Sequence, residues 1–176
     1  MKIIAFGAST SSTSINKTLA SYAAHLIENA DVTVLDLNDY DVPLFSEDKE
    51  KEIGQAEGAK AFLNDISQAD ALVISFAEHN GAYTAAYKNL FDWSSRIERN
   101  VFQDKPAIYL ATSPGPGGAQ NVLAAASGSA GYFGADVKAS LSIPSFYDNF
   151  DLETGAFKNE ALAQQVKQAV DVLKHE

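Results

Sequence analysis

Residues 3–16 read IIAFGASTSSTSIN, an apolar run followed by a glycine and a polar turn. The run from Ile3 to Phe6 is continuously apolar, as expected of a strand covered on both faces of a parallel sheet. The turn from Gly7 to Asn16 carries seven hydroxyl or amide side chains and leads into a segment with helical periodicity. The stretch therefore predicts a strand, a tight connection and a helix, which is the repeating unit of an α/β fold.

The same alternation of strand-length apolar runs and helical patterns continues along the whole chain. It predicts an open parallel sheet with helices on both faces, joined by right-handed crossovers. The expected strands are Ile3–Phe6, Val32–Leu35, Ala71–Phe76, Ala107–Ala111 and Val137–Leu141, and the expected helices span 16–29, 56–68, 87–97, 119–132 and 162–173.

Two connections are expected to be long loops, at 38–54 and 142–158. Long ordered loops in a compact domain are usually functional or form interfaces. The loop at 38–54 holds the acidic cluster Glu47, Asp48, Glu50 and Glu52. A solvent-exposed stretch without a function is an equally good interpretation of this cluster.

Composition limits the partners of the protein. The 176 residues are 46% hydrophobic and 20% charged, which fits one globular domain over 1–176 and excludes disorder. A net charge of −10 disfavours nucleic acid and anionic membranes as partners. The absence of cysteine excludes disulfides, thiolate metal sites and a cysteine nucleophile. With neither a signal-peptide core nor an apolar run long enough to span a bilayer, we expect a cytoplasmic protein.

Ligands of doubly wound sheets bind beyond the carboxyl ends of the strands, so the loops after the first, third and fourth expected strands are the candidates. The loop that follows the first strand, Gly7 to Asn16, offers hydroxyls and helix-start amides, and it contains no Lys or Arg. This indicates a phosphate cradle built from neutral dipoles. The alternative is a Ser/Thr-rich turn that only caps the helix. The loop lacks the Walker and dinucleotide patterns, which favours a mononucleotide.

The second and third loops are short of bulky side chains. In residues 77–83, Gly81 allows a positive φ or a close approach to a flat ligand, and His79 is either a ligand-facing ring or an exposed loop histidine. Residues 112–119 hold three glycines, which either allow the backbone to approach a ligand closely or form a flexible turn. A phosphate-binding loop that faces two loops with few bulky side chains predicts a binding site for flavin mononucleotide (FMN). No two histidines are spaced as metal ligands, so no metal is expected.

These residues resemble the NADPH-dependent FMN reductase family of flavodoxin-like proteins, which includes chromate and quinone reductases. Ser14-Ile15-Asn16 matches the end of the family's phosphate loop, although the family's Arg is absent, and 77–81 stands where the family has Pro-Glu-Tyr-Asn-Gly. The resemblance extends to about Leu141 and includes 41–48 and 88–96. It implies a three-layer sandwich with a five-stranded parallel sheet in the order 2-1-3-4-5.

The resemblance also implies which residues bind FMN. Ser9, Ser14, Ile15 and Asn16 would hold the phosphate, Glu78, His79, Asn80 and Gly81 would line the isoalloxazine, and Ser113, Gly115, Gly117 and Gly118 would flank its pyrimidine side.

One helix is implied to pack across a homodimer or homotetramer. It carries Asp92, Trp93 and Arg96, and the spacing of Asp92 and Arg96 also allows a local helix pair. Trp93 is equally well explained as a core residue.

The expected activity is transfer of electrons from NADPH or NADH through FMN to a small acceptor: a quinone, flavin, azo compound or metal oxyanion. Because the cofactor carries this chemistry, no catalytic acid or base is assigned. The alternatives are a flavodoxin-like electron carrier without its own pyridine-nucleotide activity, and an unrelated phosphate-binding protein of the same fold.

Overall fold

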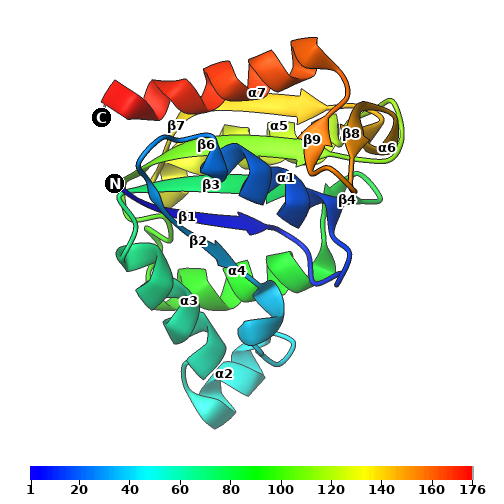
Figure 1. The fold of residues 1–176 in the computed structure, drawn as a ribbon. Coiled ribbons are helices and arrows are strands. Elements are labelled where there is room, and N and C mark those ends of the chain that lie inside the picture. The colour runs from blue at the N-terminus through cyan, green and yellow to red at the C-terminus, as the bar shows by residue number, and fades with distance from the viewer. Residues whose placement is uncertain (176) are drawn as a thin grey trace.

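The computed structural model describes residues 1–175, and Glu176 lies outside this range. Its centre is a five-stranded sheet in the order β2-β1-β3-β6-β7, and all neighbouring strands are parallel (Figure 1). This confirms the predicted strand order. The strands are β1 (Lys2–Gly7), β2 (Asp31–Leu35), β3 (Ala71–Phe76), β6 (Lys105–Thr112) and β7 (Ala135–Ile143).

Helices cover both faces of the sheet, and the alternation along β1 decides which side chains meet which layer. Ile3 and Ala5 join one hydrophobic cluster, whereas Ile4 and Phe6 join the other. Both clusters are buried against the same sheet, which explains the unbroken apolar strands. The helices α1 (Ile15–His25) and α7 (Glu160–Asp171) cover the first face, and α3 (Glu57–Ser67), α4 (Ala85–Ile97) and α5 (Gln120–Ser129) cover the second.

The segments expected as long loops contain regular structure. The acidic cluster lies on a helix, α2 (Glu47–Ile53), which begins at Ser46 because the Ser46 hydroxyl accepts a hydrogen bond from the Lys49 amide. Acidic side chains in its first turn complement the helix dipole. After β7, the chain forms α6 (Phe146–Asn149) and a hairpin of β8 (Phe150–Asp151) and β9 (Ala156–Phe157). The remaining short elements are η1 (Leu37–Asp39), β4 (Glu78–His79), β5 (Ala82–Tyr83), η2 (Ala130–Phe133) and η3 (Val172–His175).

The helix α4 attaches the 41–54 segment to the domain. Trp93 is fully buried and its Nε1 donates to the carbonyl of Pro43 at 2.6 Å, which confirms the core interpretation of this residue. Arg96 pairs with Glu50 of α2 at 2.8 Å. Asp92 pairs with Lys88 at 2.7 Å, so the expected pair of Asp92 and Arg96 is replaced by two other ion pairs.

None of the helices within residues 1–175 is both long enough and apolar enough to cross a bilayer.

Candidate functional site

The loops that follow β1, β3 and β6 meet at the carboxyl edge of the sheet, as the switch-point geometry predicts. They line an open cavity of about 300 Å³. Seven predicted site residues line it: Ser9, Ser14, Ile15, Asn16, Glu78, His79 and Ser113. The other lining residues are Ser11, Thr13, Ala77, Thr112, Pro114 and Tyr147, while Asn80, Gly81, Gly115, Gly117 and Gly118 lie outside the lining.

Gly7 allows α1 to begin directly against the end of β1. A Cβ atom at this position would lie 2.3 Å from the backbone nitrogen of Lys17 and 2.7 Å from its Cα. Any larger residue therefore collides with backbone rather than with a movable side chain. The close contact places the first residues of the helix, Ile15 and Asn16, at the cavity. Their amides lack intrahelical acceptors because they open the helix, and the helix dipole there favours an anion.

The hydroxyls of the loop 7–16 are compatible with both interpretations drawn from the sequence, helix capping and phosphate binding. Ser14 caps α1, because its Oγ accepts a hydrogen bond from the Lys17 amide at 3.1 Å. Ser9 Oγ accepts from the Ser11 amide at 3.1 Å. Both bonds use an oxygen lone pair, so each hydroxyl hydrogen remains available for a ligand. The capping role is confirmed, and it is compatible with phosphate binding.

Asn16 joins the helix to two strands. Its side chain is almost fully buried. Its Nδ2 donates to the carbonyl of Thr112 at 3.1 Å, while its Oδ1 accepts from the Thr112 amide at 3.0 Å and from Ser75 Oγ at 2.7 Å. These three bonds use the side-chain oxygen and one of the two side-chain N–H groups, and the backbone N–H of Asn16 opens the helix without an intrahelical acceptor. Its side chain connects α1 to the ends of β3 and β6.

The second loop is a β-hairpin that the sequence analysis missed. β4 and β5 pair antiparallel through the contacts Glu78–Tyr83 and His79–Ala82. The connecting residues Asn80 and Gly81 both have positive φ, at 52° and 78°. An Asn-Gly pair between two short extended segments is the strongest local signal for such a hairpin. That signal is present in the sequence and could have identified it.

Glu78 attaches this hairpin to α5. Its carboxylate accepts a hydrogen bond from the backbone amide of Val122 at 2.8 Å, and from Asn121 Nδ2 at 3.4 Å. A carboxylate at a helix start is stabilised by the unpaired amides and by the dipole. The side chain of Glu78 therefore positions the hairpin, and His79 is exposed at the cavity.

The third loop is fastened to the segment that follows β7. The carbonyl of Ser113 accepts from the Phe146 amide at 3.0 Å, and that of Gly115 accepts from the Ser145 amide at 2.9 Å. Gly118 has a positive φ of 59°, and a Cβ there would lie 2.3 Å from Ser142 Oγ. The glycine-rich loop is thus ordered by specific contacts, which argues against the flexible-turn interpretation.

Tyr147 lines the cavity from α6, and no sequence pattern pointed to it. It lies in the segment that was expected to be a loop. Hydrogen bonds from Ser145 and Phe146 to the third loop bring this segment beside the three candidate loops. A residue placed by such long-range contacts leaves no local signal.

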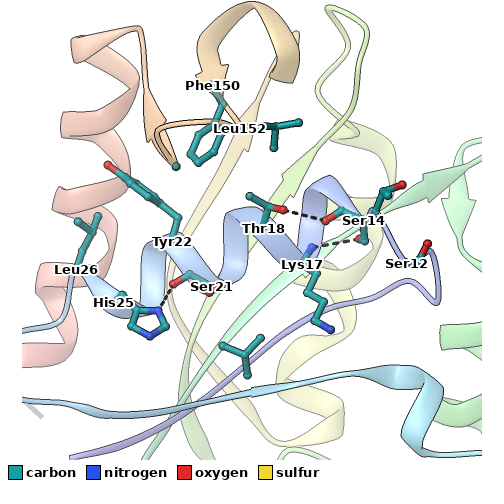
Figure 2. A pocket seen from close by; sticks show the side chains of 13 residues that line it. Ser12, Ser14, Lys17, Thr18, Ser21, Tyr22, His25, Leu26, Phe150 and Leu152 are labelled. Atoms are coloured by element: carbon teal, nitrogen blue, oxygen red, sulfur yellow. Dashed lines mark hydrogen bonds between the residues drawn. The ribbon is translucent and has the colours of Figure 1, made fainter.

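Lys17, the first cation of α1, is directed away from the cavity. Its Nζ lies 2.5 Å from Asp36 Oδ2. It lines a larger groove of about 780 Å³ that runs along α1 and is bordered by Tyr22, Phe150 and Leu152 (Figure 2). The groove shares Thr13 and Ser14 with the cavity, and Ser14 is the one predicted site residue in its lining. The cavity where all three loops meet is the better site candidate.

The ion pair of Lys17 predicts a pH effect on stability. The hydrogen bond from Lys17, followed by those from Asn38, lowers the pKa of Asp36 from 3.8 to about 2. A lowered pKa means that the carboxylate stabilises the folded state at neutral pH, and that this contribution disappears as the pH falls from about 4 to about 2. Asp36→Asn should therefore be less stable than the wild type at neutral pH, and the difference should vanish in acid. Chemical denaturation across this pH range measures it.

Asp31→Asn is the matched control, because Asp31 is exposed on β2 and has no ion pair within the described residues. The prediction would be contradicted if the loss of stability in Asp36→Asn did not depend on pH, or if Asp31→Asn lost as much stability.

The sequence model of NADPH-dependent FMN reductases matches residues 1–147 of this chain. The chain belongs to this family. Quinone reductase from Escherichia coli (strain K12) is 35% identical over 75 residues, which are 43% of this chain and 40% of that protein. NADPH:quinone oxidoreductase from Arabidopsis thaliana is 35% identical over 80 residues, 46% of this chain and 40% of that protein. The chain thus matches 40% of the length of these curated relatives.

Solved structures share the fold over almost the whole chain. FerB, a flavoenzyme NAD(P)H:(acceptor) oxidoreductase from Paracoccus denitrificans, superposes with a TM-score of 0.79 at 23% identity, covering 97% of this chain and 93% of that one. The azoreductase AzrA gives a TM-score of 0.61 at 18% identity, with 98% of both chains covered. At such identities these likenesses establish the flavodoxin-like fold.

The family model describes NADPH-dependent FMN reductases, which agrees with the predicted cofactors, FMN and NADPH or NADH. The site also fits FMN on its own geometry. The helix-start amides and the hydroxyls of the first loop are donors suited to a phosphate. Gly81, Gly115 and Gly117 lie outside the cavity lining but belong to the two loops that border it, and a Cβ at any of them would meet nothing within 4 Å. A planar ring can approach the backbone there.

Within residues 1–175, no group of three His, Cys, Asp or Glu side chains is arranged to hold a metal ion.

Proposed function

We propose that this protein is an NAD(P)H-dependent reductase that uses FMN to pass electrons from a reduced nicotinamide to quinones, flavins, azo compounds or metal oxyanions. The observation that carries the proposal is that three loops line one cavity at the carboxyl edge of the sheet. One loop is rich in hydrogen-bond donors, and the other two have few bulky side chains. Several relatives are named as quinone reductases, which supports a quinone as the acceptor.

The residues of the chain would bind and orient the flavin. Ser9, Ser14 and the amides of Ile15 and Asn16 would hold the phosphate. The hairpin 78–83 and the loop 113–118 would border the ring, with Glu78 holding the hairpin in place. FMN, when bound, accepts hydride from the nicotinamide and passes electrons to the acceptor. The protein's contribution is placement of the ring, and none of these side chains needs to exchange a proton.

The test is direct turnover. The purified protein is reconstituted with FMN, and oxidation of NADPH and of NADH is followed spectroscopically with a quinone present. Turnover without a second protein supports the reductase, whereas reduction that requires a protein partner would indicate the electron-carrier alternative. Failure to retain or titrate FMN would exclude both.

The hairpin provides a specific prediction for flavin binding. Gly81→Val should weaken FMN binding about tenfold, because a β-branched residue is strained at the φ of 78° that the turn requires. The space around Gly81 is open, so the effect comes from the backbone and not from a clash. Titration with FMN fluorescence as the signal measures it.

Gly81→Asn is the matched control, since asparagine tolerates positive φ and keeps the turn. Equal affinities of both variants and the wild type would show that the hairpin does not shape the site.

We further propose a single FMN-binding domain over 1–176, a homodimer or homotetramer, and a cytoplasmic location. The apolar side chains of Leu44 and Ile53, which are 83% and 47% exposed, support an association surface at the 41–54 segment. The lack of cysteine fits a reducing compartment. Light scattering of the purified protein tests the oligomeric state.

A further inference from the structure

The strongest unassigned feature of the cavity is the phenol of Tyr147. Its side chain lines the cavity and is half-exposed. Within residues 1–175, its hydroxyl has no hydrogen-bond partner. An exposed phenol that borders a donor-rich cavity is an available donor for a bound anion.

The backbone around Tyr147 is fixed, although its hydroxyl is unpaired. The preceding residues Ser145 and Phe146 donate their amides to the third loop at 2.9 and 3.0 Å. Lys158 Nζ donates to the carbonyl of Tyr147 at 2.9 Å. The ring of the fully buried Phe146 packs against that of Tyr147, with centroids 5.8 Å apart. The backbone of Tyr147 is therefore held at the edge of the cavity that this residue lines.

The cavity lacks a cation for the phosphate. Its lining contains no Lys or Arg among the described residues. Lys17, the nearest one in sequence to the first loop, pairs with Asp36. The hydroxyl of Ser113 is also occupied, because it donates to the carbonyl of Gly115 at 3.1 Å. A phosphate in this cavity would depend on neutral donors, and each additional one adds appreciably to its affinity.

We propose that Tyr147 binds the phosphate of FMN through its phenol O–H and thereby discriminates FMN from riboflavin. The proposal rests on the proposed function, since it requires FMN in this cavity. A neutral O–H that donates to a phosphate oxygen forms a charge-assisted hydrogen bond, which is about twice as strong as a neutral one. The phenol thus supplies part of what an arginine would provide in a loop that has none.

The experiment compares the affinities of FMN and riboflavin for the full-length apoprotein by fluorescence titration. Tyr147→Phe retains the ring and removes only the hydroxyl. It should weaken FMN binding about tenfold and leave riboflavin binding unchanged. Tyr132→Phe is the matched control, because Tyr132 is an exposed tyrosine on η2 that does not line the cavity. It should change neither affinity.

Two results would overturn the proposal while leaving the reductase function intact. The first is an unchanged FMN affinity in Tyr147→Phe. The second is an equal loss for FMN and riboflavin, which would place the phenol against the flavin ring. A wild-type protein that binds neither flavin would overturn the proposed function together with this inference.

Discussion

Replacing Gly7 by alanine is expected to destabilise the protein by about 3 kcal/mol and to abolish tight FMN binding. The added methyl group would lie 2.3 Å from the backbone nitrogen of Lys17 and 2.8 Å from the carbonyl carbon of Asn16. Because both atoms belong to the backbone, the start of α1 must move away from β1. That movement displaces the amides of Ile15 and Asn16 from the cavity. Urea unfolding and FMN titration measure the two effects.

Gly128→Ala is the control for this substitution. Gly128 lies in α5, where a Cβ would meet nothing within 4 Å, so alanine should stabilise the helix by up to about 1 kcal/mol. If Gly7→Ala were as stable as Gly128→Ala, the contact between β1 and α1 would be looser than described.

Replacing Asn16 by alanine is expected to cost about 3 kcal/mol of folding free energy and to weaken FMN binding. The substitution leaves the amide and carbonyl of Thr112 and the hydroxyl of Ser75 without their partner, and all three groups are buried. Buried polar groups without a partner cost about 1–3 kcal/mol each. Thermal unfolding of the apoprotein measures the first effect, and flavin titration measures the second.

Asn64→Ala is the matched control, since Asn64 is exposed on α3 and its side chain makes no hydrogen bond within the described residues. Its stability should stay close to that of the wild type. A similarly small loss in Asn16→Ala would mean that Asn16 does not connect the strand ends.

The sheet and its order could be predicted from the sequence because the signals are local. The uninterrupted apolar runs of β1 and β3 identify strands covered on both faces, and the glycine that ends β1 marks the first connection. The helix α2 was missed because none of its residues is buried, so it has no apolar periodicity. Its only signals were the Ser46 cap and the acidic first turn.

The candidate site was predicted at the level of loops and less well at the level of side chains. Asn16 bonds to Thr112, 96 residues away, and Glu78 bonds to Val122, 44 residues away. Contacts of this separation leave no pattern in the sequence. They also explain why the side chains of Asn16 and Glu78, both predicted to bind the ligand, instead bond to other parts of the chain, and why Tyr147 was not predicted.

The bonds of Asn16 and the close packing at Gly7 have a kinetic consequence. Because the first loop is held by the chain's own contacts, its amides are arranged before any flavin arrives. The entropy of ordering the loop is then lost during folding and not during association. Uptake of the cofactor should be a single fast bimolecular step. Its observed rate constant should increase linearly with flavin concentration, without a slower rearrangement after binding.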